Sequence, residues 1–196
     1  MITQMTTKQS IGPQTVIYPM PALVVGTMVN DKPNFMTAAW SGIACSEPPM
    51  LSVAIREQRH TRKGISLKSH FSINIPRANQ AEWVDYVGIA SGKNEDKNKI
   101  AGIEVIFDEP SHTPMINNCP VCLACRVEHI LSLGTHDLVI GEIIQTYVDE
   151  DCLTNGKPDA SKINPLVYAA GQANYHSLGP IVAKAFSVGT KLKRSS

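Results

Sequence analysis

The sequence has almost no excess charge of either sign, and this absence excludes several classes of partner. Lysine plus arginine number 18 and aspartate plus glutamate 17, so the formal net charge is +1. A protein that holds a nucleic-acid backbone or an anionic membrane surface by charge carries a clear basic excess. The composition therefore predicts neither nucleic acid nor membrane among the partners.

Long hydrophobic runs are also missing. The longest nearly apolar run, residues 19–29, is interrupted by glycine and proline, and it is shorter than the roughly 20 residues that a membrane-spanning helix needs. Residues 1–10 are polar and lack the apolar segment of a secretory signal. The five cysteines, an odd number, do not suggest a disulfide framework. These features together predict a cytoplasmic protein.

Several well-known catalytic motifs are absent. The sequence contains no glycine-rich dinucleotide fingerprint, no P-loop, no His-Glu-x-x-His zinc motif and no Gly-x-Ser-x-Gly turn. What remains is an ordinary globular composition, with 43% hydrophobic residues, 13 glycines and 13 prolines. Its 196 residues suit one domain, which we place at 15–196 after a flexible tail at 1–14.

Short runs with β-strand character dominate the chain. The predicted strands are 22–29, 34–44, 50–55, 71–75, 121–130, 138–148 and 166–169. The predicted helices are 61–69, a segment from Asn79 with Glu82 as its capping-box partner, and a short closing helix at 180–186. Because strands outnumber helices and most connections are short, the sequence favours a mainly β fold. We expect an antiparallel barrel, closed or nearly closed, with flanking helices.

Three of the cysteines have a spacing that is typical of iron–sulfur ligation. Cys119, Cys122 and Cys125 form a Cys-x-x-Cys-x-x-Cys run. The run lies in a predicted strand, where the period of two directs Cys122 and Cys125 to opposite faces. The pattern therefore favours small buried apolar cysteines, and an iron–sulfur or metal protein remains the alternative.

Two other segments could bind a ligand. Residues 56–63 hold four arginine or lysine side chains directly after a strand and at a predicted helix start, an arrangement that binds phosphate. A solvated basic loop is the alternative interpretation. Residues 34–49 are mostly small, so that backbone amides can approach a flat heteroaromatic ring, although a tightly packed barrel strand explains the same pattern.

The order of the segments resembles the flavin reductase-like, FMN-binding split-barrel family, and within it the flavoredoxin type. The matching stretches are 34–50, 56–61, 71–76, 84–92 with Asp96 and Lys97, 134–142, 165–168 and 175–179. The resemblance covers roughly residues 15–190. It implies a six-stranded split barrel, a homodimer, and FMN bound non-covalently near the subunit interface.

Carried over position by position, the resemblance assigns the flavin ring to Asn34, Met36, Thr37, Ala38, Ala39 and Trp40. It implies that Cys45 and Ser46 lie beside the ribityl chain, and that Arg56, His60 and Thr61 hold the phosphate. Further members of the same pocket would be Lys97, His136, Tyr168 and Tyr175. The chain departs from the family at Glu47, where aspartate is common, and at His60, where serine is common. Neither change removes a donor from the phosphate site.

The function that the resemblance implies is an NAD(P)H-dependent flavin reductase or a flavoredoxin-like electron transfer protein. A nicotinamide nucleotide and an electron acceptor would then be its partners. We predict no catalytic residue and no metal ligand, because the cofactor itself performs the difficult chemistry. One alternative is a flavin-binding electron carrier that does not oxidise NAD(P)H, and a less favoured one is the iron–sulfur or metal protein.

Overall fold

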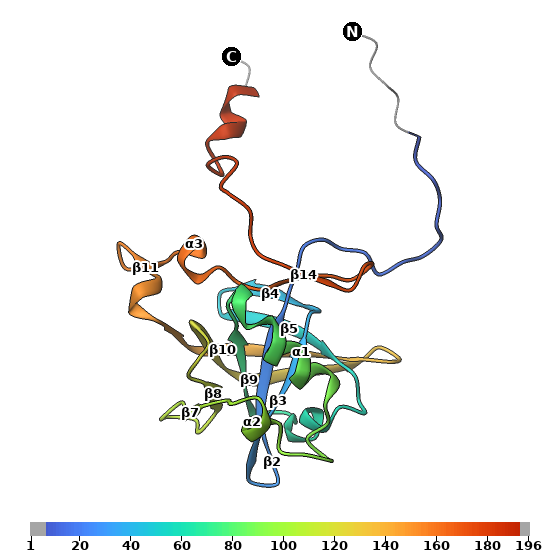
Figure 1. Cartoon of the computed structure of the whole chain (residues 1–196), viewed down its shortest axis with the longest axis vertical. Coiled ribbons are helices and arrows are strands. Elements are labelled where there is room, and N and C mark those ends of the chain that lie inside the picture. Colours follow the sequence, from blue (N-terminus) through green and yellow to red (C-terminus); the bar gives the residue numbers. More distant parts are fainter. Residues whose placement is uncertain (1–6, 193–196) are drawn as a thin grey trace.

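The computed structural model describes residues 7–192, and one large antiparallel sheet dominates it (Figure 1). The sheet has seven strands in the order β3-β2-β6-β9-β10-β5-β4, one more than the resemblance implies. Their bounds are β2 Leu23–Val29, β3 Lys32–Ala38, β4 Ser41–Ser46, β5 Pro49–Ile55, β6 His70–Ile75, β9 Val121–Ser132 and β10 Asp137–Val148. The mainly β, antiparallel class predicted from the sequence is confirmed.

The two edge strands of this sheet, β3 and β4, are consecutive in the chain. Ala39 and Trp40 alone separate the end of β3 from the start of β4, yet the two strands lie at opposite edges. The sheet must therefore coil until its edges meet at this junction. The single strand predicted over 34–44 is wrong, because the chain leaves one edge and joins the other in the middle of that range.

Two apolar clusters lie on the two faces of the sheet. One fills the inside of the coil and includes Val25, Val53 and Phe71. The other lies under helix α1, Ala81–Ile89, and includes Phe35 and Val84. Side chains on one face of a strand thus pack in one cluster, and those on the other face pack in the second cluster. Because both faces are buried, the strand sequences are strongly hydrophobic.

The helices differ from the sequence prediction in extent. The helix predicted at 61–69 is only a 3-10 helix, η1 His60–Gly64. At Gly64 a Cβ atom would lie 2.1 Å from the Met28 carbonyl oxygen, so this close approach to β2 requires glycine and ends the helix. The helix predicted from Asn79 begins as a 3-10 turn, η2 Ala78–Gln80, and continues as α1.

The remaining elements are short. They are β1 Met20–Pro21, α2 Lys97–Ile100, β7 Val105–Phe107, β8 Pro114–Ile116, η3 Glu150–Cys152, β11 Leu153–Thr154, β12 Lys157–Pro158, α3 Ala160–Ile163, β13 Val167–Ala169, β14 Asn174–His176 and η4 Val188–Leu192. The sheet β1-β13-β14 lies beside the junction of β3 and β4 and closes that end of the molecule.

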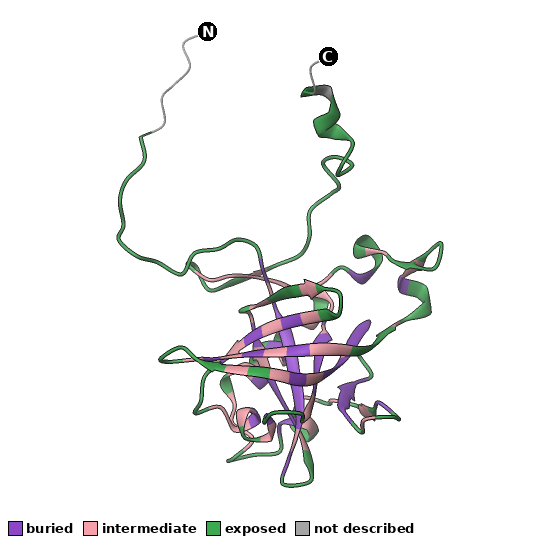
Figure 2. Ribbon diagram, turned by 180° about the vertical axis from the view of Figure 1, so that it is seen from behind, coloured by how far each residue is buried: buried purple, intermediate pink, exposed green. Residues whose placement is uncertain are grey.

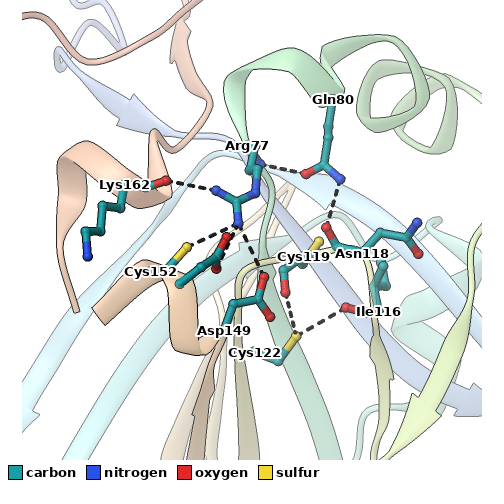
Figure 3. A network of polar contacts seen from close by, with 10 residues as sticks. Arg77, Gln80, Ile116, Asn118, Cys119, Cys122, Asp149, Cys152 and Lys162 are labelled. Carbon is teal, nitrogen blue, oxygen red and sulfur yellow. Dashed lines mark hydrogen bonds and ion pairs between the residues drawn. The ribbon is translucent and has the colours of Figure 1, made fainter. Parts of the chain in front are cut away.

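Arg77, which follows β6, connects the end of that strand to the segment between β10 and β13 (Figure 3). Its guanidinium donates to the Lys162 carbonyl at 2.8 Å and to the Cys152 sulfur at 3.2 Å. The same group lies 3.4 Å from a carboxylate oxygen of Asp149 and 3.6 Å from one of Asp151. Asp149, Asp151 and Cys152 are close enough together to hold a metal ion, but the arginine already supplies their cation.

Both ends of the described chain leave the body as extended, exposed arms on the same side (Figures 1 and 2). The helix predicted at 180–186 is wrong, since this segment is irregular. Ile181 is 84% exposed and Val182 97% exposed, and a helix this short is stable only when an apolar face packs against a partner. Among residues 7–192, no helix is long and apolar enough to cross a membrane.

Candidate functional site

The candidate site lies at the junction where the two edges of the large sheet meet. A cavity of about 380 Å³ opens there, between the junction, α1 and the β13-β14 hairpin, and we name it the aromatic pocket. Two ring pairs line it. Trp40 and His136 are stacked with centroids 4.7 Å apart, and Tyr168 and Tyr175 are tilted with centroids 5.7 Å apart. These rings provide faces on which a flat ligand can pack.

Strand β3 supplies the backbone wall of this pocket. In the described chain β3 pairs only with β2, so the amide groups on its other edge are available to a ligand. The Thr37 hydroxyl donates to the Val84 carbonyl and thereby fixes α1 to β3. The Thr37 side chain therefore positions the helix with its proton, and the Thr37 backbone lies at the pocket wall.

A second cavity, of about 220 Å³, adjoins the aromatic pocket, and we name it the cationic corner. Met36, Arg56 and Arg59 line both cavities, so the two lie side by side. The corner is completed by His60, Thr61, Ala90, Ser91, Gly92 and Lys97. Three arginine or lysine groups thus line a small space that is suited to a phosphate.

Lys97 is the most unusual group of the corner. It is only 3% exposed, and its ammonium donates to the carbonyls of Val87 at 3.0 Å and Ala90 at 3.3 Å, at the C-terminal end of α1. No carboxylate in residues 7–192 forms an ion pair with it. Burial, reinforced by the Arg59 charge, lowers the pKa of Lys97 to about 8. A buried cation with no counter-ion favours an anionic ligand.

The other polar groups of the corner are held by contacts within the chain. The Thr61 hydroxyl is buried and donates to the Asn34 side-chain oxygen at 2.8 Å. The Arg59 guanidinium donates to the Gly88 carbonyl at 2.7 Å. At Gly92 a Cβ atom would lie 1.9 Å from the Asn34 amide nitrogen, so only glycine lets this loop approach so closely. The contacts of Thr61 and Asn34 therefore stabilise the shape of the cationic corner.

Both histidines of the site have lowered pKa values. Burial first, and then the charges of Lys63, Lys97 and Lys93, lower the pKa of His60. Burial and the Arg56 charge lower the pKa of His136. Each imidazole is therefore neutral at pH 7, and each can donate one hydrogen bond to a ligand.

The structure brings most of the predicted site residues together. Around the aromatic pocket and the cationic corner lie Met36, Thr37, Ala38, Ala39, Trp40, Arg56, His60, Thr61, Lys97, His136, Tyr168 and Tyr175. Asn34 lies beneath the corner rather than at the ring pocket. Within one chain Cys45 and Ser46 are not brought to the site, because they pair with Met50 and Pro49 at the far end of β4.

Sequence reasoning missed several residues of the site. Arg59 stands in the basic segment that indicated a phosphate site, so its charge could have identified it. Asp85, Gly88, Ser91 and Gly92 lie in the stretch 84–92 that resembles the family, but their residue types gave no signal of a role in the site. They reach the site because α1 and the loop after it fold over β3, which is a contact that local sequence does not encode.

The three clustered cysteines do not share a site. Cys119 and Cys122 belong to the apolar cluster under α1, whereas Cys125 belongs to the cluster inside the coiled sheet. The prediction that strand alternation separates Cys122 from Cys125 is thus confirmed. Burial raises the pKa of both thiols to about 12, so neither is a ready thiolate ligand. This geometry argues against a common iron–sulfur cluster.

Comparison with known proteins agrees with this geometry. The family described as "Flavin reductase like domain" matches residues 15–177. The chain belongs to this flavin reductase-like family. Its membership supports a redox function that involves a flavin, and its fold is the split barrel of that family.

Two solved structures illustrate the similarity within the flavin reductase-like family. The flavoredoxin of Methanosarcina acetivorans is 34% identical, with a TM-score of 0.91 over 96% of this chain and 100% of that one. The flavoredoxin of Desulfovibrio vulgaris (Miyazaki F) is 38% identical, with a TM-score of 0.88 over 93% of this chain and 100% of that one. Among curated relatives, the FMN reductase (NADH) RutF of Stutzerimonas stutzeri is 24% identical over 80% of this chain and 82% of its own length.

Proposed function

We propose that this protein binds FMN non-covalently and transfers electrons through it, with NADH or NADPH as the reductant. One observation carries the proposal: the aromatic pocket adjoins the cationic corner, where Lys97 is buried without a carboxylate partner among the described residues. A flat ring with a phosphate at the end of a short chain fits this pair of cavities. The names of the relatives, flavoredoxins and an NADH-dependent FMN reductase, support the same conclusion.

Each group of the site has a task in this proposal. Arg56, Arg59 and Lys97 provide charge-assisted hydrogen bonds to the phosphate. The free amide edge of β3 donates to the polar edge of the ring, where negative charge accumulates on reduction. FMN, when bound, supplies the hydride and electron chemistry itself. The chain therefore needs no nucleophile and no acid–base pair.

The open side of the aromatic pocket admits the second reactant. Trp40 is 40% exposed and stacks on His136, so the rim there is apolar and accessible. A nicotinamide can approach the ring from this side, and an electron acceptor can take its place afterwards. Since His136 is neutral at pH 7, it donates or accepts a hydrogen bond without adding a charge near the reduced ring.

We also propose that the protein is a homodimer in the cytoplasm. Ile43 on β4 is 75% exposed, and the C-terminal arm exposes Ile181 and Val182. Large exposed apolar side chains such as these can be buried at a protein interface. All five cysteines are free thiols, which suits a reducing compartment.

The direct test is an absorbance spectrum of the purified protein, followed by release and identification of the chromophore. We expect a flavin spectrum and FMN as the released compound. Steady consumption of NADH or NADPH when an acceptor is added would support the reductase. Reduction only by a partner protein, without NAD(P)H turnover, would identify the carrier instead, and a colourless protein that binds no added flavin would refute both.

Replacing Arg56 with alanine should lower the affinity for FMN far more than the affinity for riboflavin, because only FMN carries the phosphate. The lost charge-assisted hydrogen bond is worth roughly 1.5–3 kcal/mol, or about ten- to a hundredfold in affinity. Fluorescence titration of the ligand-free protein measures both constants. Lys157→Ala, an exposed cation on β12, is the control and should change neither. Equal losses for both ligands would contradict the assignment of the phosphate.

A further inference from the structure

The C-terminal arm, residues 180–192, leaves the body of the protein without a hydrogen bond to it. Among residues 7–192, the hydrogen bonds of the arm all join groups within the arm itself. Its large apolar side chains are exposed (Figure 2), and they are Ile181, Val182, Phe186, Val188 and Leu192. Phe186 also has a φ of 58°, a left-handed conformation that a bulky side chain rarely adopts. The arm thus has a conformation that no contact with the rest of the chain stabilises.

The sequence of the arm has the period of an amphipathic helix. Positions 181, 185, 188 and 192 are all apolar, and this spacing of i, i+4, i+7 and i+11 places them along one face of an α-helix. Val182 and Phe186 widen the same face. The polar positions fall on the opposite face, and they are Lys184, Ser187 and Thr190. A short helix of this kind is stable only against an apolar surface, which explains why residues 180–187 are irregular in one chain.

An apolar groove of about 520 Å³ lies where the arm begins. No charged residue lines the groove, and Ile17 and Pro19 belong to its walls. Pro19 also lines a small cavity with residues 177–179, which lead into the arm, so the groove and the start of the arm lie side by side. Ala39 and Trp40 line both the groove and the aromatic pocket, so the groove adjoins the candidate site.

We propose that the C-terminal arm of a second copy of this chain binds in the groove as an amphipathic helix and covers the Trp40 side of the aromatic pocket. The inference rests on the proposed function, because it names the contact through which the proposed homodimer forms. A two-fold axis that places the two grooves opposite each other lets both arms exchange at once. Each site is then complete only in the dimer.

The position and the charge of the arm favour a second copy as the source of the occupant. The arm begins beside the groove of its own chain and continues away from the body (Figure 1), so its apolar face lies beyond that groove. The apolar face of the predicted helix carries no charge, and neither does the lining of the groove. Burying one against the other therefore removes apolar surface from water without desolvating a charged group.

Cysteine cross-linking tests where the arm binds. A chain with Ile17→Cys and a chain with Phe186→Cys should form a covalent dimer when they are mixed and mildly oxidised, and a non-reducing gel detects it. All variants carry Cys45→Ser, since the other four cysteines are buried. Lys184→Cys in place of Phe186→Cys is the matched control, and it should give several-fold less dimer because Lys184 lies on the polar face.

A proline substitution tests whether the bound arm is a helix. Ser187 lies on the polar face, so Ser187→Pro removes no apolar contact but interrupts a helix. It should raise the dissociation constant of the dimer at least about tenfold, whereas Ser187→Ala should leave it unchanged or lower it. Sedimentation velocity over a dilution series measures both constants. A dimer that tolerates the proline would refute the helix.

Each other outcome overturns the proposal in a distinguishable way. A dimer in solution without the cross-link between chains would place the interface elsewhere, while the proposed binding of flavin stands. A link within a chain that carries both Ile17→Cys and Phe186→Cys, without covalent dimers, would mean that the arm closes its own groove. A monomer whose arm binds vesicles of anionic phospholipid would assign the arm to a membrane. Failure of the wild type to bind FMN or riboflavin would refute the proposed function, and the cross-linking needs no flavin.

Discussion

Lys97 shows at the scale of one residue how the fold creates a binding group. In the sequence it lies in a polar stretch that favours a solvated loop, yet the structure buries it against the carbonyls that end α1. A buried amine keeps its proton only at a cost in free energy. An anion beside it relieves that cost, which couples the binding of a phosphate to the protonation of this side chain.

The affinity for FMN should fall as the pH rises through about 8. Free Lys97 loses its proton there, because burial and Arg59 lower its pKa to about 8. The phosphate stays dianionic above its second pKa of about 6 and favours the protonated amine. Binding above pH 8 therefore takes up a proton and weakens by up to about tenfold per pH unit. Calorimetric titration between about pH 7 and 9.5 measures the slope.

Riboflavin and two lysine variants control this experiment. Riboflavin has no phosphate, so its affinity should not share the slope, and a common slope would contradict the role of Lys97. Lys97→Met should remove the slope for FMN, whereas Lys99→Met, an exposed lysine on the same helix, should keep it. The stability of the ligand-free protein should move the other way. It rises between about pH 8 and 10.4, because the unfolded chain then binds more protons at Lys97.

At the scale of elements, the aromatic pocket depends on a contact between β14 and α1. The Tyr175 hydroxyl donates to an Asp85 carboxylate oxygen at 2.9 Å, and Tyr175 pairs in register with Tyr168 on β13. Burial and this hydrogen bond raise the pKa of Tyr175, so its hydroxyl stays protonated as a donor. The contact holds the hairpin against the helix and keeps the wall of the pocket in place.

Replacing Tyr175 with phenylalanine should lower the affinities for FMN and for riboflavin by the same factor. The ring remains, but the link to Asp85 is lost, and one hydrogen bond is worth about 0.5–1.5 kcal/mol, or about two- to tenfold in affinity. Titration with both flavins measures the effect. Tyr168→Phe is the matched control with a smaller expected loss, since its hydroxyl has no hydrogen-bond partner among the described residues. A selective loss of FMN would mean that Tyr175 acts on the phosphate instead.

At the scale of the whole molecule, the C-terminal arm leaves the body of the protein with its side chains exposed. Its apolar side chains project into solvent, and Figure 2 shows the arm exposed along its length. Burial of apolar surface is the main favourable term in association. In the proposed homodimer, a second copy of the chain would provide a surface that covers these side chains.

The double variant Val182→Asp, Phe186→Asp should shift the protein from dimer to monomer. Charged groups at these positions would have to be buried in the interface, which costs more free energy than the contact returns. Light scattering at micromolar concentration measures the mass. Lys184→Ala lies between the two positions and should leave the dimer intact. A double variant that remains dimeric would show that the arm is not part of the interface.

The local pattern of the sequence predicted the separation of Cys122 from Cys125 and five strands of the large sheet, namely β2, β5, β6, β9 and β10. Hydrophobic periodicity is a property of neighbouring residues, so it can be recognised without knowledge of the fold. The family resemblance added the order of the ligand-binding segments. Where the chain changes direction without a strong turn signal, as at Ala39 and Trp40, the local pattern was insufficient.

Only the tertiary structure decided which groups share a site. Asn34 and Thr61 are 27 positions apart yet hydrogen-bonded, and the contact between Tyr175 and Asp85 spans 90 positions. The coiling of the sheet brings its two edges together, and the folding of α1 over β3 provides the carbonyls against which Lys97 is buried. These features depend on packing between distant segments, whose free energy belongs to no local stretch of the chain.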